Sequence, residues 1–129
     1  MAEVLAPAVG DRMGIDVSAR SAGILGIQDA PADPRAVGVC RELGLDLSDH
    51  HSQPVSEALL QWADRVLVME LEQATHIRRY YTDIGDRLLP LGPFGGYGDI
   101  PDPRGGWNWR FRRSRNQIQA CLEGFFRRM

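Results

Sequence analysis

The sequence contains no lysine, only two cysteines and no long uninterrupted run of apolar residues. Two thiols, Cys40 and Cys121, are too few for a disulfide framework or a tetrahedral zinc site, so we expect both to be reduced and packed in the interior. A helix that spans a membrane needs about 20 apolar residues, and no segment approaches that length. The first residues carry Glu3 and no basic residue before Arg12, unlike a secretory signal. We therefore expect a cytoplasmic protein without membrane contact.

All fifteen basic residues are arginine, and they are unevenly distributed. From Arg104 onward there are seven arginines and one acid, Glu123, so this end carries a net charge of +6 and the residues before it carry −8. Arginine favours bidentate contacts with phosphate and carboxylate groups. We interpret the basic end as a solvated or substrate-facing edge, and we do not expect nucleic acid as the partner.

The chain length of 129 residues and a hydrophobic content of 43% fit a single domain over residues 1–129. Apolar residues at helical spacing alternate with short apolar runs typical of buried strands. The expected helices cover residues 2–13, 33–44, 56–62, 71–81 and 107–128, and the expected strands cover residues 17–22, 65–69 and 87–89. This alternation predicts an α/β domain with a parallel sheet, whose functional site lies beyond the carboxyl ends of the strands.

Residues 92–106 form a loop rich in turn-forming residues, with six glycines and three prolines among fifteen positions. Asp102 lies in this loop between Pro101 and Pro103. A carboxylate fixed by two prolines on an otherwise mobile loop is suited to carry a proton to a leaving group. The chemistry of these residues alone favours the simpler alternative, that Asp102 is an Asp-Pro turn residue.

Six short motifs follow one another along nearly the whole chain. They are Met1-Ala2-Glu3, Ser21-Ala22-Gly23, Asp33-Pro34-Arg35-Ala36, LDLSDH at residues 45–50, ADRVLVM at residues 63–69 and DIPDP at residues 99–103. In this order and spacing they resemble the low-molecular-weight protein tyrosine phosphatase family. The resemblance implies a three-layer α/β fold around a small parallel sheet of four strands. It also implies a phosphomonoester hydrolase that uses no cofactor and no metal.

The resemblance assigns roles to particular positions. It implies that a cysteine thiolate attacks phosphorus, while an arginine and backbone N–H groups at a helix N-terminus bind the phosphoryl oxygens. Asp102 matches the position of the general acid. Ser21 and His50 match positions that support the phosphate loop through hydrogen bonds, although a turn serine and a loop histidine remain possible interpretations of the same residues.

The sequence departs from the family pattern after the acid. The family often has aromatic residues directly after Asp-Pro, whereas this chain has Arg104 followed by two glycines. We expect Arg104 and Trp107 to form the rim of the substrate site, with Arg104 attracting an acidic substrate and Trp107 offering a stacking face. A preference for phosphotyrosine is therefore left open.

The strand and the Cys-x5-Arg phosphate loop of the family are expected immediately before Met1, and neither is present in these 129 residues. The segment from Cys121 to Arg127 has the spacing of that motif. It lies within an amphipathic helical pattern and close to the end of the chain, so we reject it as a phosphate loop. In the resembling fold the missing strand is central, and without it two strand edges would be unpaired.

Four hypotheses for the function follow. The first is an N-terminally shortened phosphatase that acts on a phosphotyrosine protein or another phosphomonoester through a cysteinyl-phosphate. The alternatives are a catalytically inactive pseudophosphatase with a binding or regulatory role, an arsenate reductase on the same scaffold, and a binding module with a basic tail. The reading frame upstream of Met1 would distinguish the first hypothesis from the second.

Overall fold

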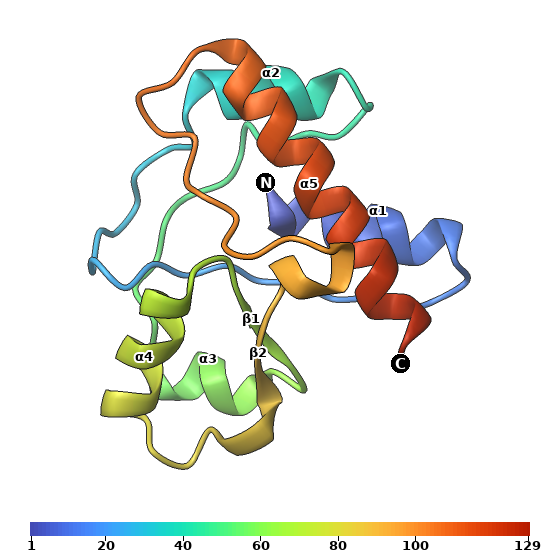
Figure 1. The fold of residues 1–129 in the computed structure, drawn as a ribbon. Coiled ribbons are helices and arrows are strands. Elements are labelled where there is room, and N and C mark those ends of the chain that lie inside the picture. Colours follow the sequence, from blue (N-terminus) through green and yellow to red (C-terminus); the bar gives the residue numbers. More distant parts are fainter.

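The computed structural model describes residues 1–129, which form helices around a small parallel sheet (Figure 1). Most predicted elements are confirmed, with ends that shift by a few residues. In chain order they are α1 (Ala2–Arg12), α2 (Pro34–Arg41), α3 (Glu57–Trp62), β1 (Val66–Val68), α4 (Leu71–Tyr80), the 3-10 turn η1 (Gly85–Arg87), β2 (Leu88–Pro90), the 3-10 turn η2 (Gly92–Gly95) and α5 (Asn108–Arg127).

Local chemistry explains where the helices begin. The carboxylate of Asp33 accepts a hydrogen bond of 2.8 Å from the backbone N–H of Arg35, and Pro34 occupies the first turn of α2. The hydroxyl of Ser56 caps α3 by accepting from the N–H of Leu59 at 3.2 Å. Such caps satisfy N–H groups that have no partner within the helix.

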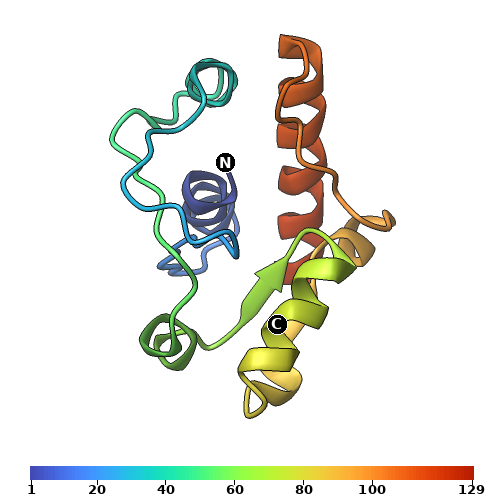
Figure 2. The same ribbon diagram turned by 90° about the vertical axis from the view of Figure 1, so that its left-hand side faces the viewer.

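Strands β1 and β2 pair in parallel, with Val66 opposite Leu88 and Val68 opposite Pro90. Val66 and Val68 contact one hydrophobic cluster, together with residues of α3 and α4. Leu67 of the same strand, and Met69 directly after it, contact a second cluster formed mainly by α1 and α5. Helices therefore cover both faces of the sheet (Figures 1 and 2), which is the three-layer arrangement that the sequence predicts.

The predicted strand at Val17–Ala22 is wrong, because the structure contains no strand there. Residues 16–20 form no backbone–backbone hydrogen bond, although Ile15, Val17 and Ala19 contact the cluster between α1 and α5. The residues between them are exposed, so the segment keeps the alternation of a strand. A strand also requires a hydrogen-bonded neighbour, and this segment has none.

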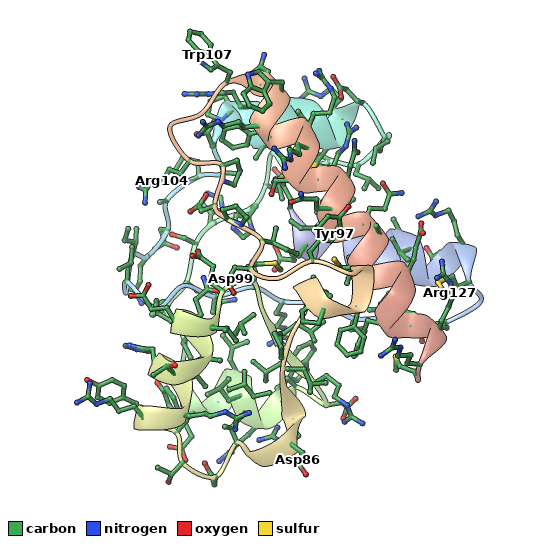
Figure 3. The ribbon with its side chains drawn as sticks, viewed as in Figure 1. Asp86, Tyr97, Asp99, Arg104, Trp107 and Arg127 are labelled. Carbon is green, nitrogen blue, oxygen red and sulfur yellow. The ribbon has the colours of Figure 1, made fainter.

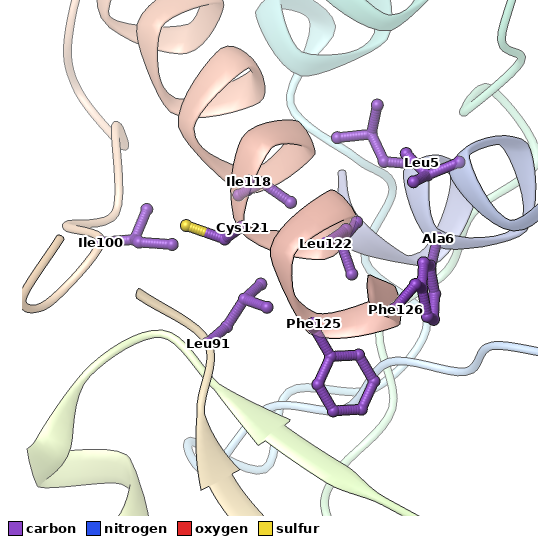
Figure 4. Packing of buried hydrophobic residues seen from close by; sticks show 10 residues of the cluster. Leu5, Ala6, Leu91, Ile100, Ile118, Cys121, Leu122, Phe125 and Phe126 are labelled. Carbon is purple, nitrogen blue, oxygen red and sulfur yellow. The ribbon is translucent and has the colours of Figure 1, made fainter. Parts of the chain in front are cut away.

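The largest hydrophobic cluster surrounds the second half of α5. Figure 4 shows side chains from α5 facing those of α1, of Leu91 at the end of β2 and of Ile100 in the following loop. The ten buried members are Leu5, Ala6, Val9, Leu91, Ile100, Ile118, Cys121, Leu122, Phe125 and Phe126. Because Ile100 belongs to this cluster, the loop that carries Asp102 is anchored to the main core.

Gly124 permits the close contact between α5 and η2. A Cβ atom at this position would clash with the carbonyl group of Phe94 in η2, so the backbone of η2 would have to move. Gly38 in α2 is different, because it is exposed and a Cβ atom there would meet no other atom within 4 Å.

These two glycines form a matched pair for substitution. We expect Gly124→Ala to lower the free energy of unfolding by about 1–3 kcal/mol through overpacking. Gly38→Ala should raise it by roughly 0.5–1 kcal/mol, because alanine loses less backbone entropy in a helix. Urea denaturation of both variants would measure the effects, and destabilisation of similar size at both positions would contradict the packing described here.

Candidate active site

The loop that carries Asp102 is fastened to the carboxyl end of β1. The backbone N–H of Ile100 donates a hydrogen bond of 2.8 Å to the carbonyl oxygen of Met69, the residue after β1. The carboxylate of Asp99 accepts from the N–H of Leu71 at 3.0 Å, at the start of α4. Figure 3 shows Asp99 and Arg104 along this loop as it runs toward α5. Asp99 therefore has a structural partner at the start of a helix.

Asp102 is exposed, and its carboxylate accepts a single hydrogen bond, of 3.0 Å, from the backbone N–H of Arg104. This bond closes a small turn, as the alternative interpretation of the Asp-Pro sequence predicts. It also leaves the second carboxylate oxygen without a hydrogen-bond partner in the protein. The turn thus holds the side chain in place and leaves it accessible, and both properties suit a general acid.

The first turn of α1 gathers the two predicted support residues around one carboxylate. One oxygen of Glu3 accepts a hydrogen bond of 3.0 Å from the backbone N–H of Ser21, and the other lies 2.7 Å from Nδ1 of His50. Gln53 extends the network, since its side-chain amide donates to the carbonyl oxygen of Ser21 at 3.0 Å. Ser21 contributes its backbone here, and its hydroxyl forms no hydrogen bond.

Sequence reasoning identified Ser21 and His50 but missed Glu3, which joins them. An acidic residue in the first turn of a predicted helix is common, because it interacts favourably with the positive end of the helix dipole. Its position alone therefore did not distinguish Glu3 from an ordinary surface carboxylate. The partial burial of these three side chains makes the network a fixed part of the fold.

The start of α1 and the acid loop share a packing partner, because Met1 contacts the hydrophobic cluster that contains Ile100. Burial lowers the pKa of the Met1 amino group, while the negative charges of Glu3 and Asp102 act in the opposite direction. The N-terminus of α1 and the acid loop therefore lie against one cluster, and the acid loop is hydrogen-bonded to the carboxyl end of β1. This is the position that parallel α/β sheets offer for a functional site.

Neither cysteine is placed to act as a nucleophile. Cys40 and Cys121 are each 0% exposed, and burial raises the pKa of both thiols. Cys121 lies within α5, and its thiol donates to the carbonyl oxygen of Gly92 at 3.4 Å. The rejection of the segment from Cys121 to Arg127 as a phosphate loop is therefore consistent with the structure, because reactive cysteines are accessible thiolates.

The two predicted rim residues lie on either side of the turn that leads into α5. The side chain of Arg104 is exposed and has no ion-pair partner. Trp107 is 76% exposed and borders a hollow shared with residues of α2 and α5, and it projects near the start of α5 (Figure 3). Their roles at a substrate site remain predictions.

No three side chains among histidine, cysteine, aspartate and glutamate come together in a way that could hold a metal ion. No helix combines the length and the apolar character required to cross a bilayer.

Comparison with known proteins identifies the fold and the family. The family model described as "Low molecular weight phosphotyrosine protein phosphatase" matches residues 1–129. The chain belongs to this family. Its members and the relatives described below are phosphatases, so the enzyme class predicted from the sequence is confirmed.

The relatives act on more than one kind of phosphorylated residue. A protein-arginine-phosphatase of Bacillus subtilis is 32% identical over 124 residues, covering 95% of this chain and 82% of the relative. A probable low molecular weight protein-tyrosine-phosphatase, EpsP of Ralstonia nicotianae, is 33% identical over 107 residues, covering 83% and 68% of the two chains. Proteins named as arginine phosphatases and as tyrosine phosphatases are therefore both similar to this chain.

Solved structures have the same fold. The low molecular weight protein tyrosine phosphatase of T. tengcongensis superposes with a TM-score of 0.92 at 28% identity, covering 99% of this chain and 88% of the other. A YwlE mutant from Bacillus subtilis gives a TM-score of 0.90 at 29% identity, covering 98% and 86%. The α/β fold with a small parallel sheet, as predicted from the sequence, is confirmed.

The network around Glu3 can be tested by substitution. We expect Glu3→Ala to speed hydrogen exchange at the amide of Ser21 by about tenfold or more, because a hydrogen bond to a charged group contributes roughly 1.5–3 kcal/mol. Glu72→Ala is the control, since Glu72 is exposed in the first turn of α4 and has no ion pair. Unchanged exchange at Ser21 in Glu3→Ala would contradict the described network.

The burial of the thiols predicts their reactivity. We expect Cys40 and Cys121 to react slowly with a thiol-specific reagent at neutral pH and quickly after unfolding in guanidinium chloride. The reason is that each thiol is inaccessible and that its raised pKa keeps it protonated. Labelling followed by mass spectrometry would measure both rates, and rapid labelling of Cys121 in the folded protein would refute its structural role.

Proposed function

We propose that this chain is the scaffold of a protein phosphatase that works through a cysteinyl-phosphate, with Asp102 as the general acid. The observation that carries the proposal is that the N-terminus of α1 and the acid loop, which is hydrogen-bonded to the carboxyl end of β1, lie against one cluster. In such a reaction a thiolate attacks phosphorus, the P–O bond to the leaving group breaks, and the acid protonates the departing oxygen. Water activated by the resulting carboxylate then releases phosphate.

The N-terminus of α1 is the proposed phosphate-binding end of the site. Its N-cap residue, Met1, provides no side-chain cap, so the first N–H groups of the helix have no acceptor from that side chain. These groups and the positive end of the helix dipole favour an anion. The network of Glu3, Ser21 and His50 would hold this turn, which supports the predicted roles of Ser21 and His50.

We further propose that the nucleophile belongs to a segment outside these 129 residues. Both cysteines of the chain are buried, so neither can supply an attacking thiolate. The extended residues 15–19 and strand β1 contact the same hydrophobic cluster. Their backbones are not hydrogen-bonded to each other, because β1 pairs only with β2. An additional strand between them, followed by a Cys-x5-Arg loop, would pair both edges and lead directly into α1.

The substrate class is proposed as a phosphorylated protein. Phosphotyrosine and phosphoarginine are both represented among the relatives, as their names state. Arg104 directly follows the acid turn and carries an unpaired positive charge. This charge favours substrates with acidic residues near the phosphate, and it disfavours a cationic guanidinium leaving group. We therefore favour phosphotyrosine within an acidic sequence.

The absence of an accessible thiol supports a second candidate function. If no strand and Cys-x5-Arg loop are encoded upstream of Met1, the chain would be a pseudophosphatase that binds a partner. Sequencing the upstream reading frame separates the two functions. An in-frame strand followed by Cys-x5-Arg supports the phosphatase, and its absence supports the binding protein.

The role of Asp102 predicts how the rate depends on the leaving group. In the protein that includes the upstream segment, we expect Asp102→Asn to slow formation of the phosphoenzyme on a phosphotyrosine peptide by about 10²–10⁴-fold. The rate on an aryl phosphate with an acidic phenol should fall much less, because that phenolate can leave without being protonated. Single-turnover kinetics on the two substrates would measure the difference.

Asp99→Asn is the matched control for this prediction. The amide oxygen of asparagine can still accept the hydrogen bond from Leu71, so the loop should stay in place and the rate should change little. Equal losses at positions 99 and 102, or a loss at Asp102 that is independent of the leaving group, would show that the acid is assigned incorrectly.

A further inference from the structure

A shallow groove, open to solvent, runs along the exposed face of the first half of α5. It consists of two adjoining hollows that share Trp109 and Arg112. The hollow toward the middle of α5, of about 470 Å³, is lined by Tyr97, Trp109, Arg112, Arg113, Asn116 and Gln117. The hollow toward its start, of about 870 Å³, is lined by Arg35, Trp107, Asn108, Trp109 and Arg112.

Three large aromatic side chains line this groove and remain exposed. Tyr97 is 40% exposed, Trp109 53% and Trp107 76%. Figure 3 shows Tyr97 in front of α5 and Trp107 projecting near the start of that helix. Exposed aromatic side chains next to arginines are typical of surfaces that bind other proteins, because they combine a large apolar area with fixed hydrogen-bond donors.

The charge of the groove is positive and only partly neutralised. Arg35 pairs with Asp33 at 3.6 Å, and Arg112 pairs with Glu42 at 2.6 Å. Arg113 lines the groove and has no ion pair. Arg110 lines neither hollow, but it also lacks an ion pair, and its guanidinium carbon lies 5.4 Å from the centre of the Trp109 ring, which lines both.

We propose that this groove is a docking site for an extended acidic segment of a partner protein. Carboxylates or phosphates of that segment would contact Arg113, the lining arginine without an ion pair, while an apolar side chain would contact Trp109. The amides of Asn116 and Gln117 could pair with its backbone. The stretch from Trp109 to Gln117 spans roughly 12 Å along the helix, enough for about four residues of an extended chain.

A protein segment fits the charge of this molecule better than a nucleic acid does. Domains that bind nucleic acid through a basic face usually have a strongly basic isoelectric point. This chain has a net charge of −2 and an isoelectric point near 5.9. Two of the groove arginines are already paired with carboxylates, so the free positive charge is too small to follow a phosphate backbone.

The groove includes Trp107, a predicted rim residue of the substrate site, but none of the proposed catalytic or supporting residues. Asp102, Ser21 and His50 do not line either hollow. The proposal therefore concerns binding alone and does not depend on the proposed phosphatase function. Docking can be absent from an active phosphatase, and it can be present in a chain that has no activity.

Fluorescence anisotropy on the 129-residue chain at low ionic strength tests the proposal. The probe is a fluorescein-labelled peptide that repeats Glu-Leu-Asp-Glu, compared with a peptide in which lysine replaces every acid and with single-stranded oligothymidylate. We expect binding of the acidic peptide only. Arg113→Glu should weaken it about tenfold, and Trp109→Ala about fivefold.

Two substitutions on other surfaces are the matched controls. Arg79→Glu changes an exposed arginine of α4 without an ion pair, and Trp62→Ala removes an exposed tryptophan at the end of α3. Both should leave binding unchanged, and circular dichroism would verify that all four variants fold alike. No binding of the acidic peptide, equal weakening by Arg79→Glu, or stronger binding of oligothymidylate would overturn the proposal. Self-association that Trp109→Ala abolishes would also overturn it, because a second copy would then occupy the groove.

Discussion

The carboxylate of Glu3 joins three segments that lie far apart in the sequence. Its two oxygens hold the backbone of Ser21 and the ring of His50 against the first turn of α1. The position of that turn matters because the helix N-terminus is the proposed phosphate-binding end of the site. If the turn moved, the geometry between it and Asp102 would be lost. The loops on this side of the sheet therefore depend on one partly buried acid.

The parts of the fold with strong local chemistry could be predicted from the sequence. The caps at Asp33 and Ser56 mark helix starts, and the apolar run at residues 65–69 predicts a strand buried on both faces. The error at residues 17–22 has a different origin. Alternating buried and exposed side chains indicate an extended backbone that packs against a core. A strand also needs a hydrogen-bonded neighbouring strand. The local sequence does not show whether such a neighbour is present.

The candidate site was predictable only in part. Asp102, Ser21 and His50 were predicted from their places in motifs, and the structure joins Ser21 and His50 through Glu3. Glu3 was missed because its partners are 18 and 47 positions away. The groove on α5 was missed for a similar reason, since Tyr97 and Trp109 belong to different segments and meet only in the folded chain. The sequence analysis interpreted the arginines near the groove as part of a basic edge, but it did not show where on that edge a partner would bind.

The central proposal is that this scaffold supplies the acid and the phosphate-binding helix, and that the nucleophile belongs to a segment outside the 129 residues. The most direct measurement compares this chain with the protein that includes the upstream reading frame, each mixed with an aryl phosphate and examined by intact-protein mass spectrometry after rapid acid quenching. We predict a phosphocysteine adduct and product release only for the longer protein. An adduct on Cys40 or Cys121 of the 129-residue chain, or turnover by that chain, would contradict the account.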